Sequence, residues 1–236
     1  MKDRKAKKII LKVLLIIIGI LYILFLYMDI FNIRVFIPSN IFKYISIILC
    51  FLITLLIGKN HLNQKDKILL QAGFFVTILA DLCFLILDYY ILGITFFCLV
   101  QIIYYNRYKR NRRYKATLIN VRLLIIFLLI MVIYRILNLF IIKIDFIFAI
   151  ALFYSICIII SVAESIRVFK NNLYPYPNKS MILWGMILFL LCDLNIAISY
   201  MTRGFFMSLH NFSNLLIWVF YLPSQVLLSV SGYKFK

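Results

Sequence analysis

The sequence predicts an all-α polytopic membrane protein, a bundle of eight transmembrane helices. Three observations predict this class: 65% of the 236 residues are hydrophobic, only 14% are charged, and the mean hydropathy of +1.04 far exceeds that of a soluble globular domain. A chain of this composition folds in lipid, where every backbone polar group must be satisfied internally. A helix satisfies these groups within one segment.

Charged residues and Pro- or Asn-rich stretches divide the chain into eight apolar segments, each close to the roughly 20 residues that a spanning helix needs. The first segment follows the basic stretch MKDRKAKK. Its apolar run is too long for a signal peptide and no small-x-small cleavage site follows, so we interpret it as an uncleaved span. All eight belong to a single integral membrane domain over residues 1–236. The predicted spans are residues 9–28, 41–57, 68–87, 89–105, 121–142, 144–163, 180–201 and 212–231.

The basic residues predict how these spans are oriented. If the connecting segments alternate between the two sides, 21 Lys and Arg residues fall on the side of both termini and five on the other. Cytoplasmic segments carry the excess of Lys and Arg, so we expect both termini in the cytoplasm. The five on the other side are Arg34, Lys43, Arg135, Lys143 and Arg203.

The net charge of +18 raises the question of an acidic partner. On so apolar a chain, anionic lipid headgroups at the cytoplasmic face explain the charge more simply than nucleic acid, and we expect no nucleic-acid partner. The densest basic stretch, NRYKRNRRYK at residues 106–115, is expected to contact these headgroups. The five cysteines lie in apolar runs without a C-x-x-C pair, and no metal or nucleotide motif occurs, so we expect no metal and no cofactor.

Two aspartates lie inside predicted spans, where a carboxylate costs roughly 2.5–3.5 kcal/mol. Asp81 stands in LADL of the third span and Asp193 in LCDL of the seventh, each 13 residues after the start of its span. The two spans run in the same direction, so both carboxylates should lie roughly 20 Å from the cytoplasmic face. The matched motif, four spans apart, also hints at two four-helix halves.

Other polar side chains fall near the level of the aspartates, and we expect them to line one polar chamber. Each also has a structural explanation. Arg135 can extend to the outer headgroups, and Gln225 can satisfy a carbonyl freed by Pro223, which has no N–H. The candidates are Gln101, Tyr104, Arg135, Asn138, Tyr154, Tyr221 and Gln225.

These stretches resemble the lysoplasmalogenase (YhhN-like) family of integral membrane proteins. Spans of that family read Gly-Asp, then A-H-x-x-Y, then G-x-x-x-F-x-x-S-D and finally Y-x-x-A-Q. The corresponding stretches here are LADLCFLI, GITFFCLVQIIYY, GMILFLLCDLNIAI and YLPSQVLLS, in the same order. Three positions depart from the pattern: Ala80 replaces glycine, Cys192 replaces serine and Gln101 replaces histidine.

The resemblance implies an intramembrane hydrolase in a bacterial cytoplasmic membrane. Its lipid substrate is a lysoplasmalogen, whose vinyl ether bond is cleaved to a fatty aldehyde and a glycerophospho-alcohol. The implied catalytic pair is Asp81 and Asp193, with Tyr104, Tyr221 and Gln225 lining the same site. Vinyl ethers hydrate under acid, and two carboxyls in a low-dielectric chamber can supply one acid and one anion. Arg135 is the expected partner of the lipid phosphate.

The residues alone leave other function classes open. Paired intramembrane carboxylates also serve proton-coupled transporters, and a lipid-binding membrane protein or a structural scaffold could use the same aspartates. A retinal-type receptor would need a mid-span lysine for a Schiff base, and none of the predicted spans has one. Release of a fatty aldehyde, as opposed to proton-coupled flux, distinguishes the hydrolase from the transporter.

Overall fold

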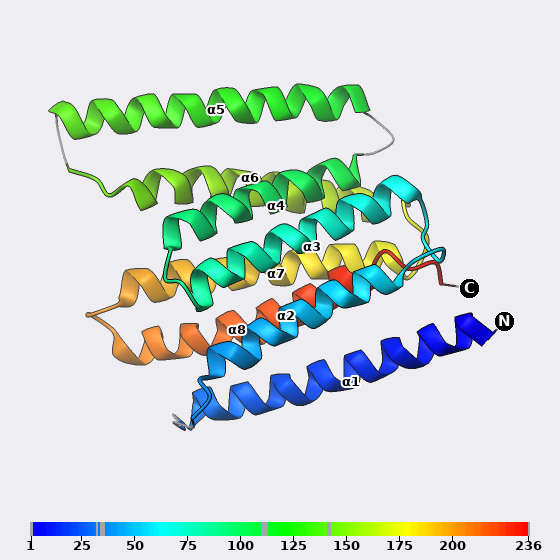
Figure 1. The fold of residues 1–236 in the computed structure, drawn as a ribbon. Coiled ribbons are helices and arrows are strands. Elements are labelled where there is room, and N and C mark those ends of the chain that lie inside the picture. Colours follow the sequence, from blue (N-terminus) through cyan, green and yellow to red (C-terminus); the bar gives the residue numbers. More distant parts are fainter. Residues whose placement is uncertain (1, 32, 34–35, 110–112, 141–142, 236) are drawn as a thin grey trace.

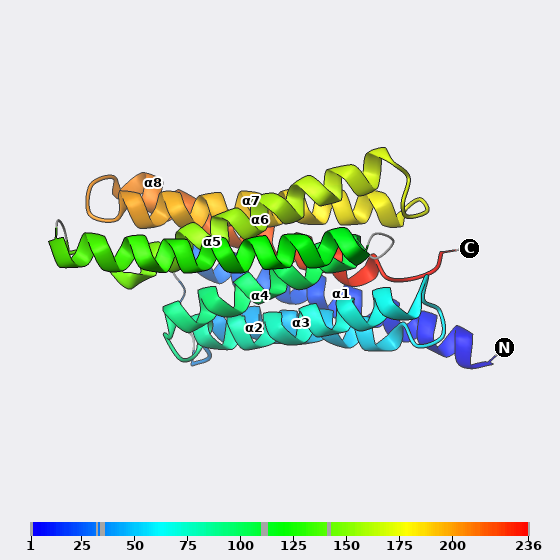
Figure 2. The same ribbon diagram turned by 90° about the horizontal axis from the view of Figure 1, so that it is seen from above.

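The computed structural model describes residues 2–31, 33, 36–109, 113–140 and 143–235, with the backbone alone at residues 2–5 and 113–116. These residues form eight α-helices that run roughly along one direction (Figure 1, Figure 2). The predicted eight-helix bundle is therefore confirmed. In chain order the helices are α1 (Lys2–Ile30), α2 (Ser39–Leu56), α3 (Gln64–Leu85), α4 (Tyr90–Tyr108), α5 (Arg113–Phe140), α6 (Phe146–Lys170), α7 (Asn178–Thr202) and α8 (Met207–Val230).

Most helices extend a turn or more beyond the apolar spans that the sequence predicts. The predicted spans cover only the apolar residues. The helices continue into the charged residues on either side and end at a capping or loop residue. At the start of α3, for example, the Asn63 side chain accepts a hydrogen bond from the Lys65 N–H at 2.8 Å, so the helix begins at Gln64 and not at residue 68. At the other end α3 stops at Leu85, so Asp81 lies about one turn from the end of the helix.

Seven of the described helices are long and apolar enough to cross a membrane, and α4 falls outside that set. Polar residues such as Gln101 and Arg107 lower the mean hydropathy of α4, and their burial explains how the bundle accommodates them. Gln101 and Arg107 are fully buried, as are the rings of Tyr104, Tyr105 and Tyr108 within 2%. Because these groups face other helices and not lipid, α4 can lie among the membrane-spanning helices although its sequence is more polar.

Six helices form a closed ring in which α2, α3, α4, α6, α7 and α8 pack in that order and α8 returns to α2. Outside the ring, α1 packs against α2 and α8, and α5 packs against α6 and more lightly against α4 (Figure 1). The contacts of α5 to α8 thus repeat those of α1 to α4. This is the arrangement expected of two four-helix halves related by a twofold axis, and it gives α3 and α7 corresponding places.

Both termini lie at one end of the bundle (Figure 1). We call this the basic end, the end at which α1, α3, α5 and α7 begin. In the sequence it receives the larger share of Lys and Arg, and by the positive-inside rule we expect it to face the cytoplasm.

A buried ion pair joins four segments at the basic end. Arg107, in the last turn of α4, donates hydrogen bonds to both carboxylate oxygens of Asp66, in the first turn of α3, at 3.0 and 3.2 Å. It also donates to the Ser231 hydroxyl at 3.0 Å, and the Tyr174 hydroxyl donates to Asp66. All the charged groups are fully buried. The cluster therefore ties α3 and α4 to the segments that follow α6 and α8.

Two basic side chains of the stretch at residues 106–115 are buried and do not face headgroups. Arg107 belongs to the buried ion pair, and Lys109 is 8% exposed with its ammonium group 3.5 Å from Glu164 of α6. Both face protein carboxylates because α4 continues to Tyr108 and carries them into the bundle. Residues 110–112 of this stretch, like Arg34 on the opposite side, lie outside the described residues.

The twofold helix arrangement and the basic split predict the topology. A reporter fused after Lys236 should be active in the cytoplasm, and one inserted between α7 and α8, at residues 203–206, should be active on the other side. Paired cytoplasmic and extracytoplasmic reporters at both positions measure this. Activity on the same side at both would show that the number of crossings is wrong.

The buried ion pair predicts that losing one partner costs more than losing both. Asp66→Asn should lower the free energy of unfolding by about 3–5 kcal/mol, because Arg107 remains charged and buried. The double variant Asp66→Leu with Arg107→Met should recover part of that loss. Thermal unfolding in detergent measures both, with exposed Lys65→Gln as the control. A double variant less stable than the single one would contradict this account.

Candidate active site

Two tyrosine–aspartate pairs lie inside the bundle. The Tyr221 hydroxyl of α8 donates a hydrogen bond to Asp81 Oδ2 of α3 at 2.7 Å, and the Tyr154 hydroxyl of α6 donates to Asp193 Oδ2 of α7 at 2.6 Å. Asp81 and Tyr221 are 4% exposed, whereas Asp193 and Tyr154 are half-buried. A short hydrogen bond from protein to each carboxyl offsets part of the cost of placing it in lipid.

Phe97 of α4 connects the two pairs. Its ring centroid lies 6.2 Å from that of Tyr154 and 6.3 Å from that of Tyr221. Phe189 of α7 packs edge-on against both Phe97 and Tyr221, at 5.8 and 5.6 Å, and Trp218 packs edge-on against Tyr221 at 5.3 Å. The two carboxyls are therefore held at one aromatic cluster built from α4, α6, α7 and α8.

Cys192 gives a second link between the carboxyls. Its side chain, 2% exposed, lies close enough to both Asp81 and Asp193 to interact electrostatically with each. Since Cys192 points into the ring from α7, the carboxyls of α3 and α7 approach the same interior region. That the two aspartates share one chamber stays a prediction.

One helical turn closer to the basic end lies a layer of buried amides. Gln101 follows Phe97 by four residues on α4, and Gln225 follows Tyr221 by four residues on α8. Both side chains are fully buried, and their amide groups have no hydrogen-bond partner within 3.5 Å among the described residues. The Gln101 amide nevertheless lies near enough to the Tyr154 hydroxyl to form a weak hydrogen bond beyond that distance. A buried amide without a hydrogen-bond partner lowers the stability of the fold. A ligand whose polar groups pair with these amides would therefore gain binding free energy here.

Tyr104 lies next along α4 and packs over the backbone of α3. A Cβ atom at Gly73 would meet Tyr104 Cε1 at 2.6 Å, so glycine is needed for the ring to approach this closely. The ring also stacks against that of Tyr108 at 6.3 Å. Tyr104 thus connects the amide layer with the buried cluster of the basic end.

The structure does not bring Arg135 or Asn138 to this group. Arg135 is exposed on α5, outside the ring. Asn138 donates to the Tyr134 carbonyl and accepts from the Ile144 N–H, both at 3.0 Å, and so closes the connection between α5 and α6. Their expected place in the chamber rested on depth, and depth along a helix does not tell which side of that helix faces the protein.

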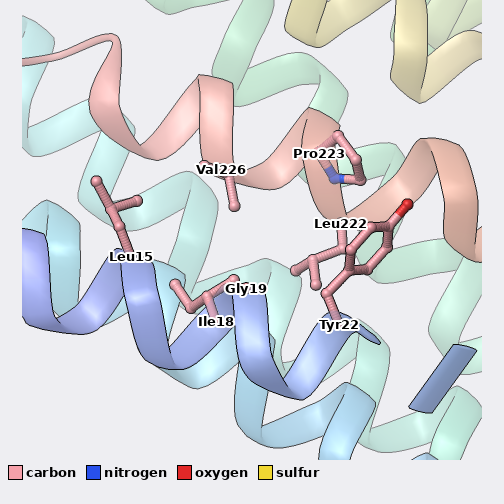
Figure 3. A pocket seen from close by; sticks show the side chains of 7 residues that line it. All are labelled: Leu15, Ile18, Gly19, Tyr22, Leu222, Pro223 and Val226. Carbon is pink, nitrogen blue, oxygen red and sulfur yellow. The ribbon is translucent and has the colours of Figure 1, made fainter. Parts of the chain in front are cut away.

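The carbonyl freed by Pro223 is satisfied by α1. Pro223 cannot donate to the Val219 carbonyl one turn earlier, and the Tyr22 hydroxyl donates to it instead at 3.2 Å. Figure 3 shows Tyr22 and Pro223 on the two sides of an apolar pocket of about 180 Å³ between α1 and α8. Gln225, the other residue considered for this carbonyl, remains available to the interior.

Sequence reasoning missed four aromatic residues of the site, among them Trp218. Phe97 and Phe189 carry no polar atom that would mark them among 22 phenylalanines. Phe97 could have been found from spacing, because F-x-x-x-Q on α4 matches Y-x-x-x-Q on α8. Tyr44 of α2 lies within electrostatic reach of Asp81, and α2 corresponds in the twofold arrangement to α6, which carries Tyr154.

A ring of helices, five of them long and apolar enough to span a membrane, with two tyrosine-held carboxyls inside defines a polytopic integral membrane protein with an intramembrane acidic site. A family model described as the YhhN family matches residues 38–232, which cover α2 to α8. The chain belongs to this family, the lysoplasmalogenase family. No curated protein and no solved structure matches the chain. Among the described residues, no group of three or more His, Cys, Asp or Glu side chains could hold a metal ion.

The hydrogen bonds of the site predict a difference between two buried tyrosines. Tyr221→Phe should lower the free energy of unfolding by about 1–3 kcal/mol, because it leaves the buried Asp81 carboxyl without its donor. Tyr105→Phe should have little effect, since the Tyr105 hydroxyl, equally buried, has no hydrogen-bond partner among the described residues. Thermal unfolding of the two variants in one detergent makes the comparison. Equal losses would mean that the Tyr221 bond does not stabilise the fold.

Proposed function

We propose that the protein is an intramembrane hydrolase that cleaves the vinyl ether bond of lysoplasmalogens to a fatty aldehyde and a glycerophospho-alcohol. The observation that carries the proposal is the pair of carboxyls, Asp81 and Asp193, held by tyrosines around one aromatic cluster. Membership of the lysoplasmalogenase family supports the same reaction. The chain of such a lipid already lies in the bilayer, so a site inside the membrane suits this substrate.

The reaction needs an acid and an anion in one place. Vinyl ethers resist bases and nucleophiles, but a proton added to the β-carbon leaves an oxocarbenium-like cation at the carbon next to oxygen. In our scheme one carboxyl gives this proton and the other, ionised, stabilises the cation. A water molecule then adds to the cation, and its proton passes to a carboxylate. The resulting hemiacetal separates into aldehyde and alcohol, with one water consumed.

The other side chains of the site orient the two carboxyls, stabilise the cation and bind the substrate. The tyrosine hydroxyls of Tyr154 and Tyr221 fix the orientation of the two carboxyls. The faces of nearby aromatic rings favour a cation by about 0.5–2 kcal/mol. The unpaired amides of Gln101 and Gln225 would bind the oxygens of the glycerol part. Arg135, exposed on α5, has no role in this scheme.

The paired carboxyls predict how substitutions combine. Asp81→Asn and Asp193→Asn should each lower aldehyde release by roughly a hundredfold or more, because amides keep the shape but transfer no proton. The double variant should be scarcely slower than either single one, since the two act as a unit. Mass spectrometry of fatty aldehyde released from a lysoplasmenyl lipid by purified protein measures the rates.

The control is Asp145→Asn, the same change at an exposed position before α6, which should keep the wild-type rate. Thermal unfolding of every variant separates loss of catalysis from loss of fold. Near wild-type rates in either site variant would refute the carboxyl mechanism. A folded wild-type protein that releases no aldehyde but moves protons across a vesicle membrane would instead favour the transporter that shares these aspartates.

A further inference from the structure

We infer that the basic end holds a pocket for the headgroup of an anionic phospholipid, separate from the intramembrane carboxyls. The pocket has a volume of about 380 Å³ and lies between the first turns of α1, the loop after α2 and the segment after α8. Its lining combines lysines with apolar and amide side chains. These residues are Lys7, Lys8, Leu11, Asn60, Tyr233, Lys234 and Phe235.

Backbone contacts fix the shape of this pocket. The Lys234 N–H donates to the Asn60 carbonyl at 2.8 Å, and Tyr233 forms an antiparallel bridge with His61. The Tyr233 hydroxyl also donates to the Ile53 carbonyl of α2 at 2.8 Å. The segment after α8 is thereby held against the loop after α2, so that Lys234 lies across the pocket from α1.

The charges of the pocket favour an anion. Lys7, Lys8 and Lys234 are all exposed, and none has a carboxylate within 4.0 Å among the described residues. Among the residues whose side chains the structure describes, the lining contains no acidic residue. Ammonium groups gathered around one pocket attract phosphate, and each lysine near a membrane surface adds roughly fivefold to the affinity for anionic lipid.

The apolar part of the lining favours a lipid over free phosphate. Leu11 and Phe235 line the same pocket as the three lysines and offer surface to a glycerol backbone or the first methylenes of an acyl chain. Lys7 and Lys8 directly precede the apolar run of α1, which begins at Ile9, so the pocket lies where that run meets the headgroup layer. Asp193, 15 residues into α7, is roughly 22 Å farther along the bundle, and the inference does not rest on the proposed hydrolysis.

The test measures lipid binding to the whole purified chain in a neutral detergent. Native mass spectrometry follows titration with dioleoyl-phosphatidylglycerol and, separately, with dioleoyl-phosphatidylcholine of the same chain length. The pocket variant is Lys8→Gln with Lys234→Gln. Lys7 is kept because its ammonium group lies 2.8 Å from where a Cβ of Gly58 would be, and so also packs on the loop. The matched variant removes the same charge from exposed positions outside the pocket, by Lys65→Gln with Lys170→Gln.

We expect wild-type protein to prefer phosphatidylglycerol, the pocket variant to lose about tenfold or more of that affinity, and the matched variant to lose less than about threefold. Equal losses in the two variants would overturn the inference in favour of general surface charge. Displacement of the lipid by millimolar inorganic phosphate would overturn the choice of a lipid ligand. Lys234→Gln alone, at an exposed position, gives a smaller loss in the same direction if the double variant unfolds, and no loss would also overturn the inference.

Discussion

A carboxyl inside a bilayer must find its hydrogen-bond partners within the protein, and the interior of the helix ring is organised around this constraint. Asp81 and Asp193 each take a tyrosine hydroxyl from another helix, and Phe97 packs between the two tyrosines. Among the described side chains, those of the helices outside the ring, α1 and α5, do not belong to this group. The ring thereby supplies each carboxyl with a hydrogen-bond donor from another helix and places both at one aromatic cluster.

The polar groups of the ring are satisfied to different degrees along its length. At the basic end Asp66 and Arg107 form a bidentate pair with further hydrogen bonds, and a fully paired buried network of this kind is rigid. The amides of Gln101 and Gln225 have no comparable partners among the described residues. This contrast separates the pair of Asp66 and Arg107, which stabilises the fold, from buried amides whose hydrogen-bonding capacity is not used by the described residues.

The sequence predicts the helices, their alternation and the two aspartates, because hydropathy and isolated charges in apolar runs are strong signals. It does not predict which side of a helix faces the interior of the ring. The candidates chosen by depth therefore include Tyr154 and Tyr221, which reach the aspartates, as well as Arg135 and Asn138, which do not. Arg107 is missed for a related reason: at the end of a span a buried arginine and a solvent-facing one have the same sequence context. Phe97 needs the matched spacing on α8 to distinguish it from any other apolar residue.

The twofold arrangement has a consequence for how two identical acids come to differ. Phe97 and Tyr221 precede glutamines by four residues on corresponding helices, but only the tyrosine has a hydroxyl to give. A symmetric dimer of four-helix chains would be obliged to surround both aspartates alike. In one polypeptide the two halves can differ in sequence. Asp81 accepts its hydrogen bond from Tyr221 of the other half, whereas Asp193 accepts its bond from Tyr154 of the same half. Covalent fusion thus permits a division of labour between acids that symmetry would forbid.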